Sequence, residues 1–218
     1  MAGPTFNSTN ATGDKYTATP VTSGAITIPG VVANDTIVVF VGCITHASPT
    51  LVPSSVVDGS QGAFTPQAFV NTNFNDSLAC FTLQNATAGT HTVTINFATA
   101  VNFWAVWGTF SNPGGSYVDQ SAAQFYSSAN PISQTITDVQ SNDTVISMLA
   151  AVVAVTAQSG TSFFNAGAIG VGCQGQYQAQ SGSGAITPSF TFGAATYGNI
   201  IAISLQNSGG SGLSWIRA

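Results

Sequence analysis

The sequence lacks glutamate altogether and has few charged residues of any kind. Only 4% of its 218 residues are charged, whereas about 25% are charged in an average soluble domain. Disorder is excluded because 44% of the residues are hydrophobic, and a disordered chain is poor in apolar residues. The length suffices for one large all-β domain or for two smaller ones.

Basic residues are scarcer still. Lys15 and Arg217 are the only two, one near each end, and seven aspartates bring the formal net charge to −5. Proteins that bind nucleic acid need Lys and Arg to neutralise phosphates, and polybasic attachment to anionic lipid has the same requirement. We therefore expect no nucleic-acid partner and no membrane partner.

Cysteine occurs in an odd number and without metal-binding spacing. The residues are Cys43, Cys80 and Cys173, and an odd count indicates no disulfide framework. Structural zinc sites use close pairs such as C-x-x-C, which the sequence does not contain. All three cysteines lie in apolar or small-residue strand patterns, so we expect buried free thiols, with no metal and no cofactor.

Signals for secretion or membrane insertion are also missing. The N-terminal segment has neither a basic start nor an apolar stretch of the kind found in signal peptides. The strongest apolar run, residues 145–157, is shorter than the ~20 residues that a membrane-spanning helix needs. Its β-branched content favours a strand.

No catalytic motif is recognisable, and we expect no enzyme. The sequence has no G-x-S-x-G elbow, phosphate loop or dinucleotide fingerprint. His46 and His91 stand in no known motif, and the aspartates lie in turn-like contexts. A calcium role for Asp35 and Asp143 would require several oxygen ligands in one place, and each of their motifs supplies one carboxylate, so a turn role is favoured.

The sequence does contain many short β patterns separated by Gly, Pro, Asn and Asp. In residues 92–97 the apolar side chains of Val93, Ile95 and Phe97 alternate and share one face. Continuous apolar runs are typical of strands that are buried on both faces. Those runs are residues 36–44, 103–110, 144–156 and 199–205.

An internal repeat is the most specific feature of the chain. Asn34-Asp35-Thr36 before one long strand matches Asn142-Asp143-Thr144 before another, at an offset of 108 residues. Residues 97–112 match residues 192–207 at an offset of 95, so the first half has the longer middle region. Two similar four- to five-stranded halves that pack face to face predict a single jelly-roll-like β-sandwich made of antiparallel halves.

Two motifs predict tight turns. Asn and Asp tolerate left-handed backbone and fold their side chains onto it, so each Asn-Asp-Thr segment is expected to fix the start of a buried strand. Asp58-Gly59-Ser60-Gln61-Gly62 lies between two strand patterns and is expected to form a β-hairpin turn.

The termini differ in composition from the body. We place the sandwich domain at residues 24–207, with half one at 24–112 and half two at 113–207. Residues 1–23 are then an N-terminal arm, and residues 208–218 a Gly/Ser link with an apolar tail. Because Trp and Arg are common interface anchors, the arms supply most candidate partner-binding residues: Lys15, Tyr16, Trp215, Ile216 and Arg217.

Trp104 and Trp107 are three residues apart, so on a strand their side chains point to opposite faces. We expect one to lie in the core and the other, Trp107, to face a partner, a sugar or the second sheet. The low charge of the whole surface also favours contact with other proteins, since charged residues are depleted at interface cores. The alternative is a neutral surface that has no such role.

Several segments together resemble a β-sandwich module of tailed-phage structural proteins and related bacterial repeat proteins. They are NDTIVVFVG (34–42), SSVVDGSQGAFT (54–65), AGTHTVTINF (88–97), WAVWGTF (104–110) and NIIAISL (199–205). The likeness covers roughly residues 24–207 and is one of turns and strands. Asp58 keeps the family's Ser-Val-x-Asp turn, whereas Phe64 stands where the family often has Trp or Tyr.

The resemblance implies a jelly-roll domain on a virion, most simply a capsid decoration (cement) protein. Its partners would be the major capsid protein and copies of itself, in a homo-oligomer such as a trimer. It would be made in the host cytoplasm and lie on the virion surface. The alternative is a carbohydrate-binding, lectin-like receptor or a tail or fibre module, for which a glycan would be the ligand.

Overall fold

The computed structural model describes residues 4–7, 13–17, 19–44, 52–71, 76–111, 116–166 and 172–207. Every regular element within those ranges is a β-strand, in keeping with the alternation and the turn residues of the sequence. The expected all-β sandwich class is confirmed. In the same ranges there is no helix long and apolar enough to cross a membrane.

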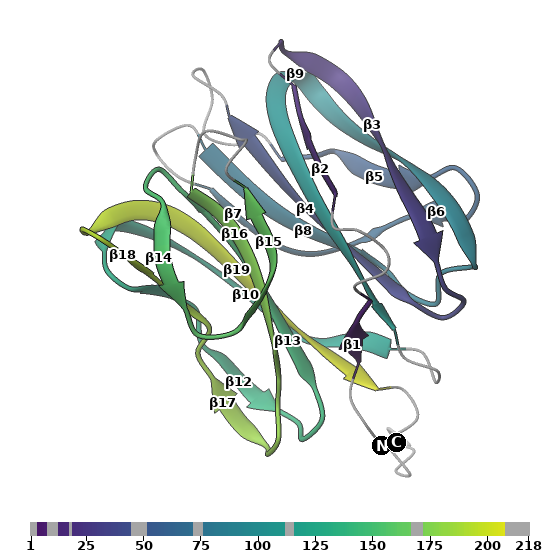
Figure 1. Cartoon of the computed structure of the whole chain (residues 1–218). Coiled ribbons are helices and arrows are strands. Elements are labelled where there is room, and N and C mark those ends of the chain that lie inside the picture. The colour runs from purple at the N-terminus through teal and green to yellow at the C-terminus, as the bar shows by residue number, and fades with distance from the viewer. Residues whose placement is uncertain are drawn as a thin grey trace, which may run out of the picture.

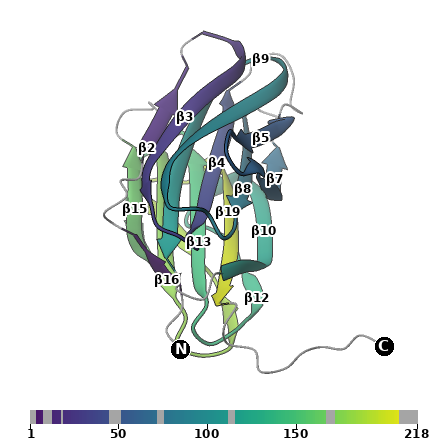
Figure 2. The ribbon, with the colours of Figure 1, turned by 90° about the vertical axis from the view of Figure 1, so that its right-hand side faces the viewer.

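The first half of the chain forms two sheets that share one long strand (Figure 1). The inner sheet has β2, β9, β4, β8 and β7 in that order, with β1 also paired to β9. The outer sheet has β3 and β5 on either side of β9, with β6 beyond β5. Figure 2 shows β9 bending over one end of the molecule with β3 beside it. The strands are β1 (Thr5–Phe6), β2 (Gly13–Tyr16), β3 (Val21–Val31), β4 (Thr36–Ile44), β5 (Ser55–Asp58), β6 (Gly62–Ala63), β7 (Thr65–Asn71), β8 (Asp76–Leu83) and β9 (Gly89–Ser111).

The second half repeats this plan with shorter outer strands. Its inner sheet has the order β10, β19, β13, β16, β15, and its outer layer consists of two small sheets, β11–β18–β14 and β12–β17. The strands are β10 (Ser116–Ala129), β11 (Ile132–Ser133), β12 (Ile136–Val139), β13 (Thr144–Ala151), β14 (Val155–Gln158), β15 (Thr161–Ala166), β16 (Gly172–Ala179), β17 (Gly184–Ile186), β18 (Ser189–Phe192) and β19 (Thr196–Asn207).

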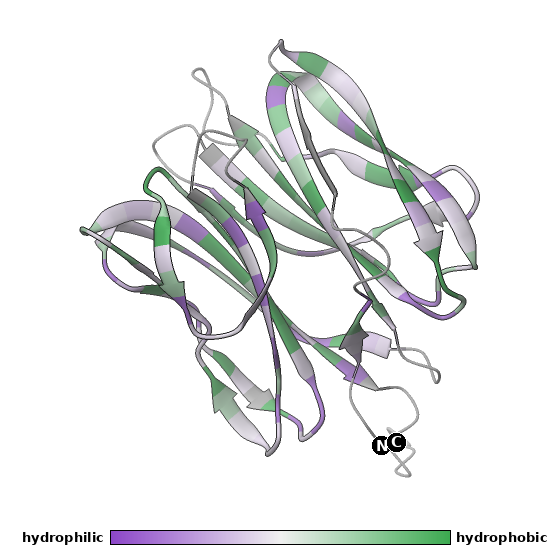
Figure 3. Cartoon of the chain, in the orientation of Figure 1, coloured by the Kyte–Doolittle hydropathy of each residue, from purple (hydrophilic) through white to green (hydrophobic). Residues whose placement is uncertain are grey.

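The sheets stack in four layers, and an apolar core fills each space between them. Figure 3 shows hydrophobic residues running along the inner strands β4, β8, β13 and β19. Between the two inner sheets, Phe40 and Trp104 share a cluster with Met148 and Ile203. The expected face-to-face packing of the halves is therefore present, but each half also folds back on itself. The reason lies in the outer part of β9, whose apolar face, which includes Val93, needs a cover of its own.

The duplication is confirmed by the pairing of the strands. Thr36 of β4 lies opposite Phe110 of β9, and Thr144 of β13 lies opposite Leu205 of β19. These pairs reproduce the offsets of 108 and 95 residues, and the order of the inner strands is the same in both halves. The difference in offset arises between β4 and β8, where the first half has the additional residues.

Both Asn-Asp-Thr segments form the same turn, as predicted. Asn34 and Asn142 have left-handed backbone, with φ of 70° and 72°. Each following aspartate accepts a hydrogen bond from the backbone N–H three residues before it, Val32 for Asp35 (3.1 Å) and Gln140 for Asp143 (3.0 Å). The turn thus closes on its own carboxylate, which gives each long strand a fixed start.

The expected N-terminal arm is corrected by the structure. Within residues 1–23, β1 and β2 pair with β9, at Thr5 with Ser111 and at Gly13 with Trp107, and β3 begins at Val21. These strands take the edge position that β10 has in the second half, so they belong to the sandwich. The physical reason is that β9 would otherwise leave the backbone groups of one edge unpaired.

Candidate functional site

A groove of about 560 Å³ opens along one side of the first half, between the β5–β6 hairpin and the edge strand β7. Its floor consists of side chains that belong to the core: Val56, Phe64, Ala79 and Phe81. The remaining lining comes from the segment before β5, from the β5–β6 hairpin and from β7, and includes Pro53 and Pro66. The groove is therefore an apolar opening onto the core of the first half.

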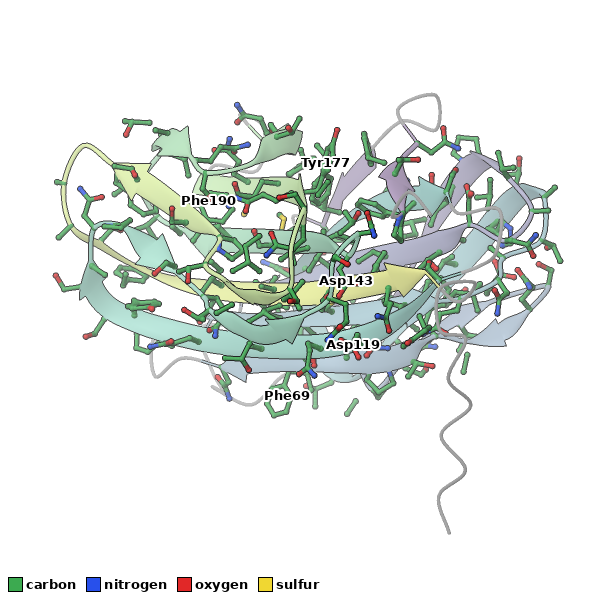
Figure 4. All side chains as sticks on the ribbon, turned by 90° about the horizontal axis from the view of Figure 1, so that it is seen from below. Phe69, Asp119, Asp143, Tyr177 and Phe190 are labelled. Atoms are coloured by element: carbon green, nitrogen blue, oxygen red, sulfur yellow. The ribbon has the colours of Figure 1, made fainter. Side chains whose placement is uncertain are left out.

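Phe69 stands at the margin of this groove and is the most exposed large apolar side chain that the structure describes, with 64% of its surface accessible. Figure 4 shows it projecting from the edge of the molecule, away from the sheets. Large apolar side chains that stay in water next to an apolar hollow are typical of interaction sites.

Two polar residues of the groove lining, Gln67 and Ser55, are engaged within the chain. The Gln67 side-chain amide donates to Thr82 Oγ1 (2.7 Å), and the Gln67 carbonyl accepts from Ser121 Oγ of β10 (2.9 Å). On the opposite wall, Ser55 Oγ accepts from the Asn96 amide (3.0 Å). The site therefore offers mostly carbon surface, held in place by contacts to both inner sheets.

The aspartates whose side chains the structure describes contribute little to the surface of the molecule. Of the four whose side chains the structure describes, Asp35, Asp58 and Asp143 are buried, and only Asp119 is partly exposed. The buried carboxylates accept hydrogen bonds in turns. Among the charged side chains that the structure describes, three of four thus serve the fold.

The wall formed by the β5–β6 hairpin is fixed by a buried pair. Asp58 Oδ2 lies 2.9 Å from His91 Nδ1, and His91 Nε2 lies 2.9 Å from the Thr87 carbonyl oxygen. Asp58 Oδ1 accepts from the backbone N–H groups of Ser60 (2.7 Å) and Gln61 (2.8 Å) and from the Ser60 hydroxyl (2.5 Å). We call Asp58, Ser60, Gln61, Thr87 and His91 the Asp58 clamp.

Burial acts to raise the pKa of Asp58, but the hydrogen bonds from Ser60, Gln61 and His91 outweigh it and hold that pKa below its ordinary value. A carboxylate and a carbonyl only accept hydrogen bonds. The ring of His91 thus lies between two acceptors, one at each of its nitrogens.

The connectivity of the clamp suits a structural role. The Ser60 hydroxyl donates to Asp58, whereas a serine nucleophile has to donate to the histidine base. Both ring nitrogens of His91 are occupied by Asp58 and Thr87. The clamp ties the predicted hairpin turn, which is present with Asp58 opposite Gly62, to the segment before β9.

Trp104 and Trp107 do point to opposite faces, as the spacing predicts. Trp104 packs in the cluster between the inner sheets and Trp107 in the cluster between the two sheets of the first half. Of the three expected neighbours of Trp107, it faces a second sheet, while its assignment to partner binding is wrong because only 7% of it is exposed. Both faces of this part of β9 are covered by other sheets, so neither indole is available at the surface.

The other candidate residues lie at the limits of the described chain. The backbone of Lys15 pairs with Ala105 and that of Tyr16 with Trp104, while their side chains fall outside the described part. Trp215, Ile216 and Arg217, like His46, lie outside the described residues altogether. Their assignment to partner binding stays a prediction.

The three cysteines are free and buried, as expected. Burial raises the pKa of Cys43 to about 11, against a hydrogen bond with Ser77 that lowers it, and burial alone raises the pKa of Cys80. Among the described residues no group of three or more His, Cys, Asp or Glu side chains could hold a metal ion.

Sequence reasoning missed Phe69 and the groove. A signal was present in Pro66, since proline within a strand marks an edge. On such a strand the adjacent apolar residues Phe69 and Val70 must point to opposite faces, and only Val70 is buried.

Comparison of the chain with protein-family models, curated proteins and solved structures gave no match.

Proposed function

We propose that the protein is a virion structural protein of the capsid decoration type, which binds the shell through the Phe69 groove. The observation that carries the proposal is an exposed phenylalanine beside an apolar groove whose lining residues carry no charge. Its support from sequence is the resemblance to tailed-phage sandwich modules. The function is mechanical: the protein covers an apolar feature of the shell and stabilises the particle.

The occupant of the groove is an apolar, uncharged segment of the major capsid protein. None of the residues that line the groove carries a charge, so a charged segment would lose its hydration without gaining a partner. A sugar needs several polar groups for its hydroxyls, and those of Gln67 and Ser55 are engaged within the chain. The carbohydrate-binding alternative is therefore the weaker of the two.

The test is co-sedimentation of the purified protein with shells of the same virus from which it has been removed. Covering an exposed phenylalanine contributes about 1.5–3 kcal/mol, so Phe69→Ala should weaken binding by roughly 10- to 100-fold. Val32→Ala is the matched control, because Val32 is also half exposed and apolar but lies in the turn before β4. It should bind like the wild type.

Two further results bear on the proposal. Affinity should change less than about threefold between low and high salt, because no charge pair is available for screening. Saturating protein should also raise the temperature at which the shells open. Strong hits on a glycan array together with no binding to shells would overturn the proposal in favour of the lectin-like alternative.

A further inference from the structure

The second half has Asp119 at the place in chain order where the first half has Asn7, although in the ladder Asp119 is an inserted residue and Gln120 takes the place opposite Ser204. Asn7 follows Phe6, which pairs with Phe110, and Asp119 follows Val118, which pairs with Leu205. Phe110 and Leu205 are themselves equivalent positions of the repeat. Asp119 also forms a β-bulge in the ladder between Val118 and Gln120, a feature that redirects a side chain.

In the first half Asn7 supplies a hydrogen-bond donor to the carboxylate of the turn. The Asn7 side-chain amide lies 3.5 Å from Asp35 Oδ2 as a donor, and the Ser111 hydroxyl donates to Asp35 Oδ1 (2.7 Å). Both oxygens of the Asp35 carboxylate are thereby partnered by neutral donors.

The second half leaves one carboxylate oxygen without a donor. Asp143 Oδ2 accepts from Ser204 Oγ (2.8 Å) and from the Gln140 N–H. Asp143 Oδ1 has no hydrogen-bond partner in the described part of the chain, although the residue is only 1% exposed. A buried carboxylate oxygen without a partner is costly.

The hydroxyl that Ser111 supplies to the turn of the first half has no counterpart at the same position of the second half. Gln206 occupies the position that Ser111 has in the first half, and its Oε1 accepts the hydroxyl of Tyr117. Burial and, to a smaller extent, the charge of Asp119 raise the pKa of Asp143, although hydrogen bonds from Ser204 and Gln140 act to lower it. The pKa of Tyr117 is raised by burial and by the charges of Asp119 and Asp143. Figure 4 shows Asp119 and Asp143 on the same part of the molecule.

We propose that Asp119 and Asp143 bind a divalent cation of the calcium type, with the Gln206 amide oxygen as a further neutral ligand. Calcium accepts carboxylate and amide oxygens in flexible geometry and completes its shell with water. Two carboxylates, one of them buried with an oxygen to spare, supply the charge. With so few protein ligands, half-saturation is expected at roughly 0.1–1 mM, the range of weak extracellular sites.

The cation would tie β10 to the turn before β13, next to the place where Thr144 Oγ1 donates to the Pro4 carbonyl oxygen. That contact joins the first described residue of the chain to the second half. The site therefore lies where the two halves meet, and it does not depend on the proposed binding to a capsid.

The test is thermal unfolding of the full chain in EDTA and in 10 mM CaCl2 at neutral pH and equal ionic strength. Calcium should raise the melting temperature by roughly 3–10 °C, and titration calorimetry should give one site per chain. Asp119→Asn restores the side chain that the first half uses, so it should fold normally and lose the calcium response. Asp58→Asn, a carboxylate change in the Asp58 clamp, should lower the melting temperature and keep the response.

Three results would overturn the proposal. One is that wild-type protein at 10 mM calcium shows neither a heat of binding in calorimetry nor a shift in melting temperature. Another is a calcium response that persists in Asp119→Asn. The third is a wild type whose stability rises on mild acidification with no effect of calcium, because the pair would then hold a proton in place of a metal.

Discussion

Removal of the Asp58 carboxylate should be among the most damaging single changes in the first half. In Asp58→Ala the backbone N–H groups of Ser60 and Gln61 and the ring of His91 lose their acceptor. Asp58 and His91 are both buried, and removing one partner of a buried pair of this kind costs about 3–5 kcal/mol. For a domain of this size that corresponds to a fall in melting temperature of roughly 6–20 °C.

Urea unfolding, followed by the fluorescence of the buried Trp104 and Trp107, measures this free energy. Because the pKa of Asp58 is lowered by folding, the stability that it contributes is present above the pKa of the unfolded chain, about 3.9. It is lost as the pH falls through the lower pKa of the folded state. The difference between wild type and Asp58→Ala should therefore be largest at neutral pH and shrink below about pH 4.

A double-mutant cycle with His91→Gln isolates the pair. If the two side chains act as one unit, the double variant should be more stable than the sum of the single losses predicts, with a coupling energy of about 1–3 kcal/mol. A loss of less than about 1 kcal/mol in Asp58→Ala, the size found for exposed ion pairs, would refute the reasoning. So would a difference between wild type and variant that does not change with pH.

Three further predictions concern the fold. Gly42→Ala should lower the free energy of unfolding by about 1–3 kcal/mol, because its new Cβ would lie 2.1 Å from the Trp104 ring. Gly59→Ala is the control, since the nearest atom to its new Cβ lies at 3.8 Å, and it should leave the same urea titration nearly unchanged. Asn142→Ala should cost about 1–2 kcal/mol by calorimetry because of its positive φ, whereas Asn142→Gly should not. Iodoacetamide should leave Cys43 unmodified at pH 8 until the chain unfolds, as mass spectrometry can check, because burial raises its pKa to about 11.

Local rules predicted much of this fold. The alternation of Val93, Ile95 and Phe97 indicated one buried face, and all three lie in the same core cluster. The Asn-Asp-Thr segments indicated two equal turns, and Asn34 and Asn142 adopt them. Such features depend on the preferences of a few adjacent residues, so a short stretch of sequence is enough to predict them.

Features that depend on distant pairing were not predictable in this way. The segment with Thr5 and Phe6 has no strong strand pattern, and it is ordered by the free edge of β9. Trp107 is buried because a second sheet covers β9, and the number of layers cannot be read from one strand. The contact between Asp58 and His91 joins residues 33 positions apart, and neither local motif points to the other.

The duplication supplies an internal control for function, because positions that serve folding alone should be alike in both halves. The turns, the strand order and the buried inner faces are alike. The halves differ where the first has additional residues between β4 and β8, the region that supplies most of the lining of the Phe69 groove. They differ again at the bulge of β10, where the second half has the additional carboxylate of Asp119 after Val118 and the first half has Asn7 after Phe6. Since the fold is complete in each half without the other's version of these features, their origin is best sought in what the protein binds.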